Sequence, residues 1–362
     1  MVHPFELRDP RVAPTYGDGP ISRLCEAALH DPRDEVFVRL TLRRIAEGSA
    51  LMAALFFAVA DPRLPAAAKL AAQGAYLAAW GWLVPPVILM LHNTMHRPFL
   101  RRPRLLGRVH PYVMSFFFGV PTGYRDHHMG MHHMEDNLPK DLSSTIAYRR
   151  DSFLHFLGYF ARFFFLGIFE VAAYLVRSRR GAMARRLVLG ELAHFAVIGV
   201  ALSLNVRFGL TAFLLPAVLV RFMMMVGNWG QHAFVNTALP NGGLSNSITC
   251  VNSGYNARCF NDGYHIGHHL RPNRHWTELP ADLEKNVATY VREGAIVFSG
   301  IDFFMVSVML WTGQWRGLAR RFVRLDGEPR SDEEVIELLR SRVGPIREWK
   351  LESIARAASP AA

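Results

Sequence analysis

The sequence predicts an all-α integral membrane protein with two transmembrane hairpins, four spans in all, together with interfacial helices and a cytosolic helical cap. Three observations lead to this fold class. The chain of 362 residues is 51% hydrophobic, and long apolar runs separate its polar segments. The net charge is +11, and the arginines gather beside the apolar runs, as they do in the cytoplasmic loops of membrane proteins. Histidines form three close clusters, which indicates a metal site.

The first predicted hairpin follows an irregular, polar N-terminal arm, residues 1–44. Its first apolar run, 45–60, is near the lower limit of the roughly 17–25 residues that a spanning helix needs. A short turn leads into a longer run, 66–91, which is long enough to cross. Arg43 and Arg44 place the start of the hairpin in the cytoplasm, so the chain returns there before the first histidine cluster.

The second predicted hairpin consists of the runs 187–204 and 208–226, which are joined by a short turn. A further apolar segment, 153–176, is interrupted by Arg162 and Glu170. If that segment also crossed, the histidines on its two sides would lie on opposite faces of the membrane. A shared metal site requires an even number of crossings, so we interpret this segment as an interfacial helix.

The remaining segments are predicted to lie outside the bilayer core. Residues 111–121 are apolar but too short to cross, and 295–311 contains Asp302, so we expect interfacial or embedded helices. The stretch 241–262, rich in Asn, Gly and Ser, is typical of a loop. Ser331–Glu334 has the pattern of a capping box that opens a helix. The expected domains are the N-terminal arm, 1–44, a membrane domain with its histidine-bearing cytosolic cap, 45–312, and a cytosolic helical tail, 313–362.

The histidine clusters have helical spacing. Residues at i, i+3 and i+4 project from one face of a helix, and each cluster contains such pairs. A further histidine follows the second hairpin. In the predicted topology all of them lie on the cytoplasmic face, as do both chain termini. The candidate metal ligands are His92, His96, His128, His132, His133, His232, His265, His268 and His269.

Nine imidazoles exceed what one ion can bind, so we expect two metal ions. Two six-coordinate ions would leave positions for water, oxygen or substrate. Nitrogen ligands suit iron, zinc and copper alike, so the ligand set alone does not identify the metal. The three cysteines form no CxxC pair, which argues against a disulfide framework and against a cysteine-ligated zinc site.

The patterns HxxxH, HxxxHH and HxxHH, spread over two transmembrane hairpins, resemble the histidine boxes of the membrane fatty acid desaturase and hydroxylase superfamily. The resemblance covers roughly residues 45–280 and includes Leu270 and Pro272 after the third box. It implies an oxidoreductase that uses two iron ions and molecular oxygen, with the eight box histidines and His232 as iron ligands. Asn228, one turn before His232, resembles a family asparagine that contacts metal through water.

Two features of the boxes leave alternatives open. His127 is adjacent to His128 and could take its place, although the family spacing favours His128. Gly267 stands where many desaturases have an acidic residue, and Arg271 stands where an aromatic residue is often found. The boxes therefore indicate the superfamily more firmly than the reaction.

Other polar residues have two readings each. Glu191 and His194 are spaced to share a helix face inside a predicted span, and a satisfied buried histidine is the simpler interpretation. His155 likewise stands alone in apolar surroundings. Acidic residues that flank the boxes either orient ligating histidines or are solvated loop residues. These acids are Asp126, Glu135, Asp136 and Asp262.

The resemblance implies a desaturase that introduces a double bond into a fatty-acyl or lipid chain drawn from the bilayer. The oxidation of an unactivated methylene requires a metal–oxygen oxidant, because no amino-acid side chain supplies one. The sequence contains no His-Pro-Gly-Gly haem motif of a fused cytochrome b5-like domain. We therefore expect a separate electron donor of the ferredoxin, rubredoxin or cytochrome b5 type.

Two alternatives are retained. A lipid or carotenoid hydroxylase or ketolase of the same superfamily would use the same iron chemistry to insert oxygen. A histidine-rich metal transporter or sensor belongs to another class, but conduction requires polar residues within the spans, and those are sparse. Nucleic-acid binding is not expected, because the basic clusters adjoin apolar runs and not polar segments studded with aromatic residues.

Overall fold

A computed structural model describes residues 6–236 and 243–347. The chain is mostly helical, as predicted, and divides into two compact units. The first, here called the hairpin unit, consists of residues 12–129 and 172–223. The second, here called the strand unit, consists of residues 1–11, 130–171 and 224–362. The chain passes between them four times, once between Arg11 and Val12 and three times within helical segments, η2 (His128–His132), α7 (Phe153–Arg177) and α10 (Leu215–Gln231).

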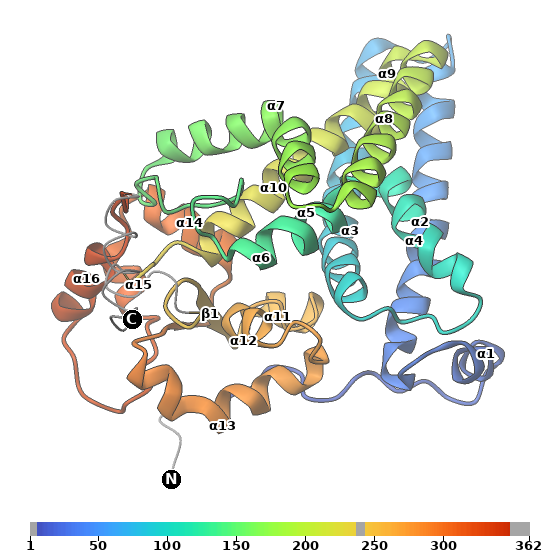
Figure 1. The fold of residues 1–362 in the computed structure, drawn as a ribbon. Helices are drawn as coiled ribbons and strands as arrows, with labels where there is room; N and C mark the ends of the chain where they lie inside the picture. Colours follow the sequence, from blue (N-terminus) through green and yellow to red (C-terminus); the bar gives the residue numbers. More distant parts are fainter. Residues whose placement is uncertain (1–5, 237–242, 348–362) are drawn as a thin grey trace. The chain divides into compact units, whose positions relative to one another are not determined.

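Two helical hairpins form the centre of the hairpin unit (Figure 1). In the first, α2 (Glu35–Ala60) packs along α3 (Ala66–His96). In the second, α8 (Gly181–Leu204) is followed by α9 (Val206–Gly209), η3 (Leu210–Leu214) and the first part of α10. Gly209 lies so close to α8 that a Cβ atom there would be 2.5 Å from the backbone nitrogen of Leu202. A glycine is therefore required where the two helices of this hairpin meet.

Helix α3 carries the first histidine cluster on its last turns. Pro85 and Pro86 lie inside the helix, which continues through them to His96. His92 and His96 are therefore one turn apart on a continuous helix, as their spacing predicts, and both side chains are buried.

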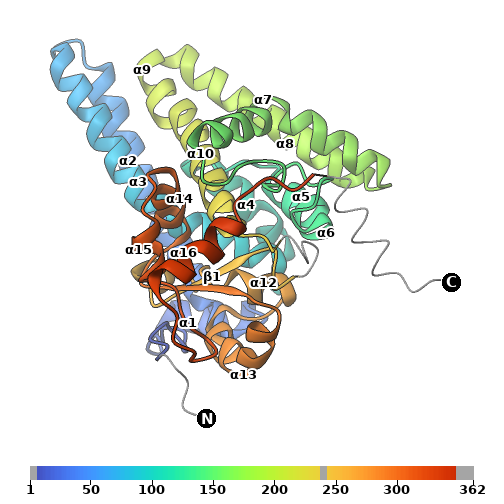
Figure 2. The ribbon, with the colours of Figure 1, turned by 90° about the vertical axis from the view of Figure 1, so that its left-hand side faces the viewer.

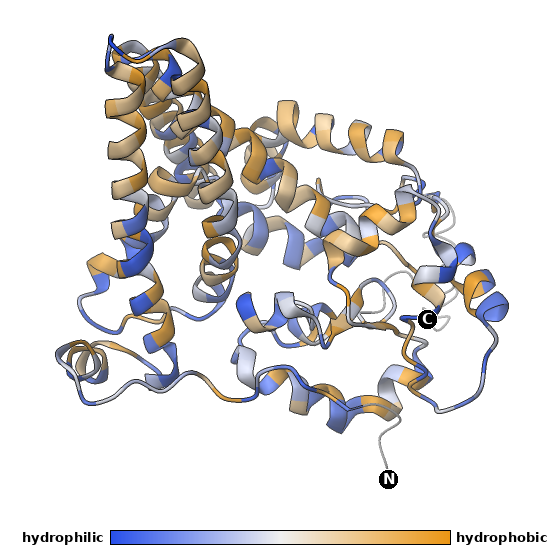
Figure 3. Cartoon of the chain, turned by 180° about the vertical axis from the view of Figure 1, so that it is seen from behind, coloured by the Kyte–Doolittle hydropathy of each residue, from blue (hydrophilic) through white to orange (hydrophobic). Residues whose placement is uncertain are grey.

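Four helical segments are long and apolar enough to cross a membrane (Figure 3). Their length and composition are those of an integral membrane protein. The predicted span 45–60 is not among them, because Glu47 lies inside this apolar half of α2 and Arg43 and Arg44 directly precede it. Helix α7 meets the criterion instead, so its interfacial placement stays a prediction. The four segments are Ala66–His96, Phe153–Arg177, Gly181–Leu204 and Val206–Gln231.

The part of the N-terminal arm in the hairpin unit is ordered, contrary to the expectation of an irregular segment. It contains α1 (Pro20–Ala28) and η1 (Pro32–Asp34). The backbone nitrogen of His30 donates to the carbonyl of Phe99 over 2.9 Å, and Arg101 donates to Ala28 over 2.7 Å. This pairing fixes the arm against the segment that follows α3. The unit also contains α4 (Arg104–Phe118) and α5 (Tyr124–His127).

A two-stranded parallel sheet lies at the centre of the strand unit. Strand β1 (Ile248–Val251) pairs with β2 (Ile296–Ser299), and every residue of β1 is buried. Three helices complete a hydrophobic core with the strands (Figure 2). They are α14 (Phe303–Trp311), α15 (Trp315–Ala319) and α16 (Asp332–Ser341).

The strands correct two expectations from the sequence. Residues 241–262 were expected to be loop, but they contain β1 and α11 (Gly254–Arg258). The apolar run 295–311 was expected to be one helix, but β2 occupies its start, and Gly300 at φ +76° separates β2 from α14. A short buried strand cannot be told from a helix by apolar character alone. The capping box at Ser331 and Glu334 is confirmed at the start of α16.

The remaining helical elements of the strand unit carry the third histidine cluster and the end of the second, or follow the third cluster in the chain. These elements are α6 (His133–Glu135), α12 (His265–Leu270), η4 (Trp276–Glu278) and α13 (Leu279–Arg292).

Arg150 joins several loops of the strand unit. Its side chain is fully buried, and burial lowers its pKa to about 9, so it stays charged at neutral pH. Its donors reach five backbone carbonyl oxygens at 2.7–3.1 Å, those of Thr145, Tyr148, Ala233, Arg342 and Gly344. A planar guanidinium has five N–H donors, which a lysine could not replace. Arg150 thereby fixes the chain directly after His232.

Candidate metal centre

Four histidines of the strand unit form one buried cluster, here called the four-histidine group. One ring nitrogen of each lies within 4.8 Å of those of the other three. The members come from η2, from the residue that follows α10, and from α12, so residues far apart in the sequence meet at one point. The group consists of His132, His232, His265 and His269.

The Nε2 atoms in the group converge at distances that suit a shared ion. The Nε2 atoms of His265 and His269 are 2.9 Å apart, and those of His232 and His265 are 3.3 Å apart. Two nitrogens bound at right angles to one ion, with bonds of about 2.1 Å, lie about 3 Å from each other. The residues present therefore fit a metal ion bound by imidazole nitrogens.

The Nδ1 atoms of three members face hydrogen-bond acceptors. His132 Nδ1 is 2.7 Å from Asp141 Oδ2, and His269 Nδ1 is 2.9 Å from Asp136 Oδ1. His232 Nδ1 is 2.8 Å from the backbone oxygen of Asn246. A neutral imidazole has one N–H, and an acceptor at Nδ1 selects the tautomer that carries the proton there. The lone pair of Nε2 is then directed toward the centre of the group, which is the usual arrangement of metal-binding histidines.

Burial and neighbouring charges set the protonation of the group. Burial lowers the pKa of His232 to about 3, and His269 and His132 act in the same direction. His232 is therefore neutral at physiological pH, the form in which imidazole binds metal. Burial also acts to lower the pKa of His132, but the carboxylate of Asp141 outweighs it and leaves that pKa raised.

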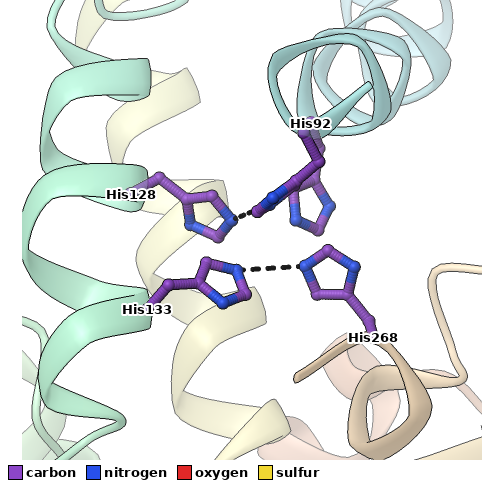
Figure 4. Close-up of side chains that lie close together, drawn as sticks. His92, His128, His133 and His268 are labelled. Atoms are coloured by element: carbon purple, nitrogen blue, oxygen red, sulfur yellow. Dashed lines mark hydrogen bonds between the residues drawn. The ribbon is translucent and has the colours of Figure 1, made fainter. Parts of the chain in front are cut away.

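A second pair of histidines lies in the strand unit. His133, the first residue of α6, has its Nε2 atom 3.1 Å from the Nε2 atom of His268 on α12 (Figure 4). Because His268 and His269 are adjacent on α12, one short helix contributes both to this pair and to the four-histidine group. The separation of the two nitrogens is again about that of neighbouring ligands on one ion.

The hairpin unit contains its own cluster, here called the three-histidine group: His92 and His96 from α3, and His128 from η2. The ring centre of His92 is 4.6 Å from that of His128 (Figure 4) and 5.3 Å from that of His96. The Nε2 atoms of His96 and His128 are 2.9 Å apart. All three side chains are buried. This group has the same short spacing between ring nitrogens as the four-histidine group.

The second box lies on a helical segment with a π turn from His128 to His132. Turns of this type inside α-helices are frequent at functional sites. His128 lies in the three-histidine group and His132 in the four-histidine group. Among the described residues, neither group includes His127, which agrees with the spacing argument for His128.

Asn228, the expected water-mediated contact, lies near the end of α10. Its Nδ2 atom donates to the backbone oxygen of Ser143 over 2.8 Å and to the hydroxyl of Tyr159 over 2.7 Å. These bonds fix the amide one turn before His232. Its contact with metal through water stays a prediction.

The acids around the boxes have different roles. Of the four flanking acids, Asp136 contacts a candidate ligand, whereas Asp126 pairs with Arg186 at 2.6 Å. Asp141 and the carbonyl of Asn246 were not identified from the sequence, because both lie on loops whose spacing from the boxes follows no helical rule. The only signal in the sequence was that Asp141 follows soon after the second cluster.

The two polar residues inside the α8 span have different surroundings. Glu191 contacts two other segments of the hairpin unit, and its pairing with His194 on one face of α8 stays a prediction. Its Oε2 atom is 2.6 Å from Nη2 of Arg221, and its Oε1 atom accepts from the backbone nitrogen of Gly123 over 2.9 Å. Gly123 directly precedes α5, which leads to His128. The buried ion pair therefore holds the start of the segment that carries the second box.

Comparison of the sequence with known families shows that the family model described as "Fatty acid desaturase" matches residues 67–300. This range is more than half of the chain and includes all nine candidate histidines. No curated protein matches the chain.

Proposed function

The chain belongs to the fatty acid desaturase family, whose members are oxidoreductases, and from this premise we propose that it is an oxygen-dependent di-iron membrane desaturase. Its proposed reaction introduces a double bond into a fatty-acyl or lipid chain. The observation that carries the proposal is the convergence of the Nε2 atoms of His232, His265 and His269, at 2.9–3.3 Å, inside a family whose chemistry is oxidation.

The proposed site uses all nine histidines as iron ligands. One ion is assigned to the four-histidine group. The remaining histidines are also proposed to bind iron, and they present pairs of Nε2 atoms at 2.9 and 3.1 Å within their own units. Asn228 is proposed to contact metal through water. The remaining five proposed ligands are His92, His96, His128, His133 and His268.

The protein contributes orientation and exclusion of water to the proposed reaction. Iron, when bound, supplies the activation of molecular oxygen that side chains cannot provide. Asp136 and Asp141 hold the Nδ1 protons of His269 and His132, which fixes the orientation of both rings. Burial of His132, His232 and His265 keeps bulk water away from the centre.

The proposed partners follow from this chemistry and from the membrane helices. The substrate is a lipid or acyl chain that enters from the bilayer, next to the four apolar segments. Electrons are proposed to come from a separate ferredoxin, rubredoxin or cytochrome b5 type donor. The arginines beside the apolar runs support an orientation with the histidines and both termini in the cytoplasm.

Expression of the chain in a host with a simple lipid composition, followed by mass spectrometry of the lipids, tests the proposal. We expect a product two hydrogens lighter than its precursor, and no such product from His268→Ala or His269→Ala. A product heavier by one oxygen would show a lipid or carotenoid hydroxylase or ketolase instead. Unchanged lipids in cells that contain the folded, iron-loaded protein would contradict both reactions.

A further inference from the structure

The N-terminal segment Glu6–Arg11 lies against the loops around the third histidine cluster, within the strand unit. The backbone nitrogen of Arg8 donates to Asn252 Oδ1 over 2.7 Å, and Asn252 Nδ2 donates to the carbonyl of Glu6 over 2.9 Å. Arg11 forms an ion pair with Glu284 on α13, with Nη1 and Oε2 2.9 Å apart. The first described residues of the chain are therefore tied to the region that surrounds α12.

Asp9 is the buried centre of this contact. Its Oδ2 atom accepts from the hydroxyl of Tyr264 and from the backbone nitrogen of Asn252, each over 2.7 Å. Its Oδ1 atom accepts from Nδ2 of Asn256 over 3.1 Å. All three partners are donors, and an ionised carboxylate only accepts, so the charge of Asp9 is satisfied without a proton. Its side chain is buried in a segment whose other polar residues are largely exposed.

The partners of Asp9 determine where α12 begins. Tyr264 is the residue before His265, and its carbonyl accepts from the backbone nitrogen of His268 over 3.0 Å. Asn256 Oδ1 accepts from the backbone nitrogen of Gly263 over 2.9 Å. Two short paths therefore run from one carboxylate to the two residues that precede His265, one through Tyr264 and one through Asn256.

Gly263 shows that the chain has little space where it leads into α12. A Cβ atom at this position would be 2.1 Å from the backbone oxygen of Cys250, so the chain passes directly against β1. The backbone nitrogen of Cys250 donates to the carbonyl of Gly263 over 2.7 Å, and Asn256 Nδ2 donates to the carbonyl of Cys250 over 2.9 Å. The start of α12 is thus held by β1 on one side and by Asp9 and its partners on the other.

We propose that Asp9 is a positioning residue for the third histidine cluster. It fixes the first turn of α12 and thereby the direction in which His265, His268 and His269 present their Nε2 atoms. A site of this kind works only when its ligands are held within about 0.5 Å of their productive places, and a six-residue helix cannot secure that by itself. This inference rests on the proposed role of the three histidines as metal ligands.

Two variants of the full-length protein as purified test the proposal. Asp9→Asn places an amide nitrogen against groups that are themselves donors, and Tyr264→Phe removes the same hydrogen bond from the other side. We expect either variant to speed hydrogen exchange of the 264–271 backbone about tenfold and to speed iron loss to a chelator about tenfold. Tenfold is the lower end of the effect, about 10- to 100-fold, that follows the loss of a residue that orients a metal ligand. Because both variants break the contact between Asp9 and Tyr264, the effect of the double variant should be smaller than the sum of the two.

Arg11→Gln is the matched control. It weakens the same N-terminal segment through the ion pair with Glu284 and leaves every hydrogen bond of Asp9 in place, so exchange over 264–271 should match that of the natural protein. Unchanged exchange over 264–271 in both test variants would overturn the proposal. Equal acceleration in β1, β2 and α12 would also overturn it, because Asp9 would then act on general stability. The exchange measurement does not depend on which metal is bound or which reaction follows, so it separates this inference from the proposed function.

Discussion

Replacement of His232 by alanine is expected to abolish product formation. The side chain is fully buried, its Nδ1 atom is held by the carbonyl of Asn246 at 2.8 Å, and its Nε2 atom is 3.3 Å from that of His265. Loss of a ligand should cost at least as much as loss of a residue that orients one, which is worth about 10- to 100-fold. We therefore expect activity to fall about 100-fold or more and bound iron to fall to about half, measured by product mass and by metal analysis.

His155→Ala is the control for this experiment. His155 is an exposed residue whose Nδ1 atom accepts from the backbone nitrogen of Arg149, and it belongs to neither histidine group. Its variant should keep the activity and iron of the natural protein. His232→Gln keeps a side chain in the buried space, and we expect it to lose iron as well. Natural activity in either His232 variant would remove this residue from the metal site.

Asp141→Asn is expected to weaken iron binding while the fold is kept. Asp141 Oδ2 lies 2.7 Å from His132 Nδ1, and its Oδ1 atom accepts from the backbone nitrogen of Ser143 over 2.9 Å. The amide removes the charge that stabilises the orientation of His132 and can present a donor to its N–H. We expect iron affinity to fall about 10- to 100-fold, measured by competition with a chelator of known affinity.

Asp151→Asn controls for the loss of a negative charge. Asp151 pairs with Arg149 at 3.1 Å and belongs to neither histidine group, so its variant should retain iron as the natural protein does. If Asp141→Asn held iron equally tightly, the carboxylate would have no role in orienting His132, and the ring would have to be fixed by its neighbours alone.

The histidines could be predicted from the sequence because ligand geometry is encoded by helical spacing. His92 and His96 are one turn apart on α3, and His265 and His269 are one turn apart on α12. A spacing of this kind survives any tertiary arrangement of the helices. The same holds for His128 against His127, where the family spacing and the structure agree.

The partners of the histidines could not be predicted, because they reach the site through loops. Asp141 and Asn246 are brought to His132 and His232 by turns whose paths depend on tertiary packing. Asp9 is the extreme case, since 255 residues separate it from Tyr264. No local pattern distinguishes such a carboxylate from an exposed one in a polar arm.

Strand β2 and the predicted span 45–60 show a different limit of prediction from the sequence. In the apolar run that begins at Ala295, β2 and α14 are both apolar, so apolar character could not tell the strand from the helix. The run 45–60 is not among the four long apolar segments, because Glu47 lies inside it and Arg43 and Arg44 directly precede it in α2. Segment length and neighbouring charge have to be considered together.

Iron content per chain, measured on the purified full-length protein together with its activity, tests the central claim most directly. Nine candidate imidazole ligands, of which four form one compact group, predict two iron ions per active chain. Removal of iron by a chelator should abolish activity, and iron alone should restore it. Full activity with a single ion per chain, or with zinc in place of iron, would contradict the di-iron site.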